Sequence, residues 1–109
     1  MKLPHGDRAV VDEQKVREYL LSDSHPVGRF KAAFFRGVGF GEENWQAFRD
    51  AILALAAAGE AVEDEATEYG QKYPVSGEIA GPKSSAEVVT IWILRTGEDA
   101  PSLVTVYPR

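Results

Sequence analysis

The spacing of apolar residues changes near the middle of the chain. Trp45, Phe48, Ile52 and Leu55 recur at intervals of three and four, which places them on one face of a helix. From residue 61 onward, apolar side chains tend to recur at every second position, which is typical of strands with one buried face. Helices followed by strands predict an α+β fold.

Three helices are predicted in the first sixty residues. The first is capped at Asp12, because an aspartate side chain can accept from the N–H groups of the first turn. The second begins at Pro26, since proline suits the first helical position, and it ends at Gly37 or Gly39. The third begins near residue 43 and ends at Gly59.

Four strands are predicted in the second half, at residues 61–70, 71–81, 87–95 and 102–108. Their connections are short, which favours an antiparallel meander because parallel neighbours need long crossovers. Pro74 indicates an edge or a bulge in the second strand, since proline cannot donate to a ladder. We therefore predict one domain, residues 1–109, with three N-terminal helices packed on one face of a four-stranded antiparallel sheet.

Side chains alternate across a strand, so each strand divides into two sets. We expect the more apolar sets to pack against the helices, among them Val89, Ile91 and Ile93. The other sets define an expected open face, where a ligand could bind. Alternatively, these residue types are there only because they favour strands. The expected open face carries Lys72, Ser76, Thr90, Trp92, Thr105 and Tyr107.

The composition restricts the class of protein. The 109 residues include no cysteine, which excludes disulfides and cysteine-ligated metals and fits a reducing cytoplasm. No apolar run approaches the roughly 18 residues of a membrane span, so we expect a soluble protein without membrane partners. The net charge of −5 is concentrated in residues 42–68, with eight acidic residues and one arginine. A broadly basic nucleic-acid surface is therefore not expected.

The start of the second predicted helix could bind an anion. His25 and Arg29 lie one turn apart there, with Gly28 between them and Lys31 following. Unpaired N–H groups at a helix start attract phosphate or carboxylate, and histidine exchanges protons near neutral pH. Alternatively, the histidine merely caps the helix and the cations are solvated. The two histidines, His5 and His25, lack the spacing of metal ligands, so no metal or other cofactor is expected.

The sequence resembles a family of small, largely uncharacterised bacterial domains over nearly its full length. The matching pieces are HPVGRFKAAFF at 25–35, GQKYPVSGEIAGP at 70–82, VVTIW at 88–92 and LVTVYP at 103–108. Relatives in that family also occur as C-terminal parts of secreted bacterial toxins. The expected layout is in turn similar to the ribonuclease toxins of the barnase, colicin and RelE group.

The toxin resemblance implies a metal-independent ribonuclease acting on RNA phosphodiesters. His25 or Tyr107 would then exchange protons with the reacting oxygens, and Lys31 with Arg29 would stabilise phosphate charge. Such a site would use two groups of residues. The expected catalytic residues are His25, Lys31, Thr105 and Tyr107, and the expected substrate-binding residues are Arg29, Lys72, Thr90 and Trp92, the last stacking a base.

Two other functions are compatible with the sequence. A non-catalytic interaction module would use the open face to bind a protein or peptide. A toxin-neutralising partner would use the acidic segment 42–68 to mimic nucleic acid. Convergence of His25, Lys31 and Tyr107 in a pocket would favour the nuclease, whereas an apolar patch around Trp92 and Tyr107 would favour the interaction module.

Overall fold

The computed structural model describes residues 1–21 and 29–109, with the side chains of residues 19, 29 and 30 left aside. It confirms the α+β class and the antiparallel sheet, which has five strands. The predicted first strand is two short strands, β1 and β2, and both pair with β3. The principal elements are α1 (Glu13–Lys15), α2 (Arg29–Val38), α3 (Trp45–Ala58), β1 (Glu60–Ala61), β2 (Ala66–Thr67), β3 (Gly70–Ala80), β4 (Ser85–Arg95) and β5 (Ser102–Pro108).

The helices begin and end largely where the sequence indicates. Asp12 caps α1 by accepting a hydrogen bond from the Gln14 N–H, and the helix continues as a π-helical turn over Val16–Leu20. Gly39, with a φ of 110°, ends α2 in the left-handed region that favours glycine. The predicted start of α2 at Pro26 lies outside the described residues. None of the helices in the described part of the chain has the length and apolar character that crossing a bilayer requires.

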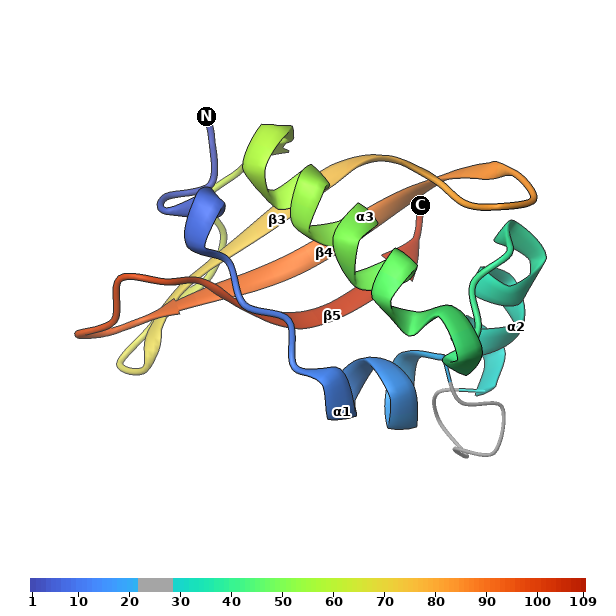
Figure 1. Cartoon of the computed structure of the whole chain (residues 1–109). Helices are drawn as coiled ribbons and strands as arrows, with labels where there is room; N and C mark the ends of the chain where they lie inside the picture. Colours follow the sequence, from blue (N-terminus) through green and yellow to red (C-terminus); the bar gives the residue numbers. More distant parts are fainter. Residues whose placement is uncertain (22–28) are drawn as a thin grey trace.

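The core lies between α3 and one face of the sheet (Figure 1). Phe48 and Ile52 of α3 are fully buried there, as the helical spacing predicts. The Phe35 ring of α2 meets the Phe48 ring edge-on, with centroids 4.9 Å apart. Phe40, just after α2, also meets the Phe48 ring edge-on, with centroids 5.3 Å apart. These contacts fix α2 against α3, so α2 reaches the β5 edge of the sheet.

Pro74 lies in β3, which is an inner strand and not an edge. Its carbonyl accepts from the Val62 N–H, so its backbone nitrogen also faces the β1 and β2 side. The ladder on that side is interrupted between Ala61 and Ala66. Pro74 has no N–H with which to return this bond to Val62, so the interruption of the ladder falls at the proline.

The predicted facing of β4 is wrong. Thr90 and Trp92 are fully buried on the face that packs against α3, whereas Val89, Ile91 and Ile93 lie on the opposite face, only half-buried. The indole Nε1 of Trp92 donates to the Thr90 hydroxyl at 2.8 Å, and that hydroxyl donates to the Val75 carbonyl at 2.8 Å. Because the indole N–H and the threonine hydroxyl both have hydrogen-bond partners, burying Thr90 and Trp92 leaves no polar group unpaired.

Alternation along β5 predicts that Val106 faces the helices and that Leu103 lies with Thr105 and Tyr107 on the open face. The first expectation is correct and the second is wrong, because Val106 and Leu103 are both buried. A β-bulge causes this difference. Trp92 pairs with Leu103 and Ile91 pairs with Thr105, so Val104 is the extra residue. Two residues three positions apart thereby reach the same face of the sheet.

Candidate functional site

A cleft of about 660 Å³ lies at the β5 edge, between this strand and the helical segments α1 and α2. It is the place where two of the predicted site residues meet. The Lys31 ammonium of α2 donates to the Thr105 hydroxyl of β5 at 2.8 Å. The cleft is lined by Asp12, Gln14, Lys15, Glu18, Lys31, Val104 and Thr105.

A second ammonium group reaches the same strand from the other helical segment. Lys15 of α1 donates to the Val104 carbonyl at 3.0 Å, next to the residue that Lys31 contacts. The bulge at Val104 breaks the regular ladder, which leaves that carbonyl available as an acceptor. Two cations from separate helices are thus held at adjacent residues of one edge strand.

Lys31 has an environment that makes its proton easier to remove. Its side chain is half-buried, and this burial lowers the pKa of its ammonium below the usual value for lysine. Loss of hydration disfavours the charged form, which is why the direction is downward. An amine of this kind suits proton transfer better than a fully solvated lysine does.

The rim of the cleft carries the opposite charge. Glu18 accepts from the Gln14 side-chain amide at 2.9 Å, and the Asp12 carboxylate is engaged by the Gln14 N–H at 2.9 Å. Both carboxylates are exposed. Since the Asp12 carboxylate caps the helix, Glu18 is the better placed of the two to act on a ligand.

Sequence reasoning missed Lys15, Glu18 and Gln14. Their signal was available, because positions 14, 15 and 18 lie on one side of the helix that Asp12 caps. What was not available is that Lys15 of this segment reaches the Val104 carbonyl of β5. Among the described residues, no group of three or more His, Cys, Asp or Glu side chains is arranged to hold a metal ion.

Of the other predicted site residues whose side chains the structure describes, none lines the cleft. Tyr107 follows Thr105 by two positions on β5 and is 39% exposed. Thr90 and Trp92 have no exposed surface, so Trp92 cannot stack on a base in this structure. His25 lies outside the described residues, and of Arg29 only the backbone, at the start of α2, is described.

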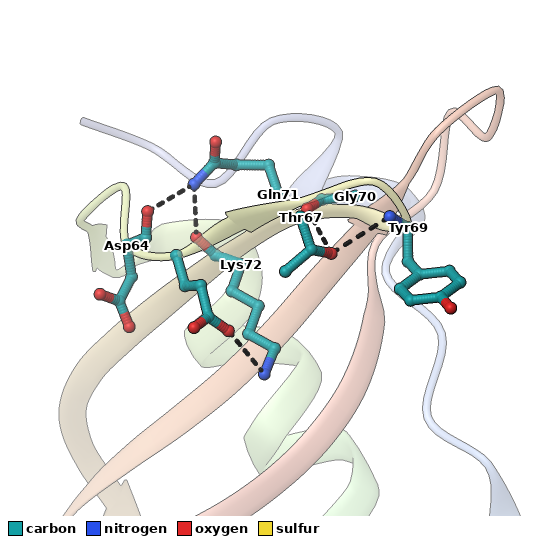
Figure 2. A network of polar contacts seen from close by, with 7 residues as sticks. Asp64, Thr67, Tyr69, Gly70, Gln71 and Lys72 are labelled. Atoms are coloured by element: carbon teal, nitrogen blue, oxygen red, sulfur yellow. Dashed lines mark hydrogen bonds and ion pairs between the residues drawn. The ribbon is translucent and has the colours of Figure 1, made fainter.

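Lys72 belongs to a separate network at the far edge of the sheet. Figure 2 shows its ammonium directed at a carboxylate, which is that of Glu65 at 3.6 Å. Its backbone carbonyl accepts from the Asp64 N–H, and the neighbouring Gln71 amide donates to the Asp64 carbonyl. These bonds attach the β1–β2 segment to β3, with β4 between them and the cleft.

Comparison with known proteins identifies the family but no named relative. No curated protein and no solved structure matches the chain. The expected resemblance to a family of uncharacterised domains is confirmed, and the family model covers all but the first residue. The chain belongs to the family described as "Domain of unknown function (DUF6883)", whose model matches residues 2–109.

Proposed function

We propose that the cleft at the β5 edge binds a phosphodiester of RNA and cleaves it without a metal ion. The observation that carries this proposal is the hydrogen bond between Lys31 and Thr105 in a cleft that also holds Lys15. Two ammonium groups can neutralise the charge of one phosphate, and a half-buried amine acts in a less polar setting than water. The Thr105 hydroxyl can orient a phosphate oxygen beside Lys31.

The reaction needs a proton acceptor and a proton donor. In the proposed step, the Glu18 carboxylate takes the proton of the ribose 2′-hydroxyl, and the 2′-oxygen attacks phosphorus. The bond from phosphorus to the 5′-oxygen breaks, and the Lys31 ammonium gives its proton to that oxygen. The products are a 2′,3′-cyclic phosphate and a 5′-hydroxyl end. Lys15 stabilises the charge on the non-bridging oxygens.

The test is cleavage of total tRNA by purified protein in excess EDTA, followed by analysis of the product ends. We expect cyclic phosphate ends, and Lys31→Met is expected to lower the rate by about 10²-fold or more, the usual contribution of a proton-transfer group. Arg36→Met is the matched control, because Arg36 is an exposed cation of the same helix outside the cleft. No cleavage at high enzyme concentration, or equal cleavage by Lys31→Met, would refute the proposal.

A protein-interaction module remains the alternative, and a different observation favours it. Val89, Ile91 and Ile93 lie half-buried on the sheet face opposite α3, next to the exposed Tyr107. An apolar surface of this kind is more typical of protein contacts than of RNA binding. Lack of RNA cleavage combined with association through this face would establish the alternative.

A further inference from the structure

The sheet face opposite α3, here called the open face, has its charges at two ends and apolar residues between them. The pairing of β3, β4 and β5 places four rows of residues across the middle of this face. The first contains Lys72, Ile93 and Ser102, the second Pro74, Ile91 and Thr105, the third Ser76, Val89 and Tyr107, and the fourth Glu78 and Glu87.

The charge pattern of the open face is complementary to the same pattern rotated by 180°. Lys72 and Glu78 stand three residues to either side of Val75 on β3. Ile93 and Glu87 stand three residues to either side of Thr90, the β4 partner of Val75. A rotation of 180° about an axis that crosses the strands at this pair therefore exchanges the positive end with the negative end.

We propose that a second copy of this chain packs on the open face to form a two-fold symmetric dimer. The strands of the two copies run antiparallel, with β3 over β3 and β4 over β4. Lys72 of each copy then lies over the Glu78 and Glu87 end of the other, and Ile91 lies over Val89. Two sheets packed in this aligned manner bury their apolar side chains in a shared layer about 10 Å thick.

The charge pattern also selects the direction of packing. The other two-fold arrangement, with parallel strands, would place the Glu87 carboxylates of the two copies over each other, which is unfavourable. The backbone N–H of Arg109 donates to the Glu87 carbonyl, so this end of the face carries two carboxylates and at most one guanidinium. Lys72 already has Glu65 as a partner at 3.6 Å, but such an open ion pair is worth little by itself and can be shared.

The dimer does not depend on the proposed RNA cleavage, since Thr105 is the one described residue that the open face and the cleft share. Either inference can therefore fail without the other. Dimer formation with no RNA cleavage would leave the open face as the functional surface of the domain. RNA cleavage by a monomeric protein would refute the dimer but would leave the proposed function of the cleft standing.

The test is sedimentation velocity over a range of protein concentrations. We expect a dimer for the unchanged protein and monomers for Lys72→Glu and for Glu78→Lys, because each variant places like charges over each other twice. Mixing the two variants should restore a dimer, since a Lys72→Glu chain and a Glu78→Lys chain complement each other at both contacts. Lys83→Glu is the matched control, because Lys83 is an exposed cation of the β3–β4 turn.

Three results would overturn the inference. The unchanged protein could stay monomeric at the highest concentration, the dimer could persist in both single variants, or the mixture could remain monomeric. Circular dichroism of each variant shows whether it has folded. Ile91→Arg provides a second route should Lys72→Glu fail to fold, because an arginine at the centre of the open face must also abolish the dimer.

Discussion

The buried pair of Thr90 and Trp92 permits a sharp test of the core. Thr90→Val keeps the shape of the side chain but removes the hydroxyl that accepts from the indole at 2.8 Å. The indole N–H would then be buried without a partner, because Trp92 has no exposed surface. Stranding a buried donor costs about 1–3 kcal/mol, and the added methyl group recovers a part of this cost.

We expect Thr90→Val to lower the free energy of unfolding by about 2 kcal/mol, with the Val75 carbonyl also losing its hydroxyl donor. For a domain of this size, that loss corresponds to a decrease in Tm of about 8 °C. Urea unfolding followed by far-UV circular dichroism measures the change. This probe is independent of the tryptophan that the next comparison replaces.

A double-mutant cycle separates the hydrogen bond from general packing. Trp92→Phe removes the indole donor, so Thr90→Val made in that background should cost about 1 kcal/mol less than in the unchanged protein. Equal costs in the two backgrounds would show that the bond between Trp92 and Thr90 does not stabilise the fold. Our explanation for the facing of β4 would then be wrong.

Three further predictions concern the backbone and the cleft. Gly81→Ala should destabilise the fold by about 1–3 kcal/mol, because a Cβ there would lie 2.4 Å from the Val38 carbonyl oxygen. Gly37→Ala has open space around it and should stabilise α2 by about 0.5–1 kcal/mol. Thermal unfolding measures both changes, and a Gly81→Ala variant as stable as the unchanged protein would contradict the packing at Val38. If RNA is cleaved, the rate should fall on the alkaline side at a pH below the usual lysine pKa of about 10.4, since burial lowers the pKa of Lys31; a decline only above that pH would exclude Lys31 as the proton donor. The unfolded chain holds the Lys31 proton to a higher pH than the folded chain does, so the free energy of unfolding should rise with pH between the two pKa values, and a pH series of urea titrations should show a smaller rise for Lys31→Met.

The helices and strands were predictable because their signals are local. Asp12 caps its helix through a neighbour two residues away, and Gly39 ends α2 through its own backbone conformation. The alternation in residues 70–80 and 85–95 likewise follows from the geometry of a single strand. Lys31 and Thr105 were both predicted from the sequence as site residues, but their contact was not. Their contact spans 74 positions, so no local pattern could place them together.

The cleft was only partly predictable because it depends on the packing of distant elements. Phe35 and Phe40 hold α2 against Phe48, and this contact brings Lys31 to the β5 edge. The bulge at Val104 supplies the carbonyl that Lys15 uses, and a bulge leaves little trace in an apolar run such as LVTVYP. Lys15 and Glu18 were therefore missed, although their helix was expected.

The sequence by itself determined which side chains of β4 share a face. Alternation along a strand is a geometric necessity, so Thr90 and Trp92 had to lie together, opposite Ile91. Only the tertiary structure decided which set faces α3. Both sets are rich in apolar residues, and the choice depends on whether the polar atoms of Thr90 and Trp92 find partners once buried. They find them in each other and in the carbonyl of Val75 on the next strand. That partner becomes available only when β3 and β4 pair in this register.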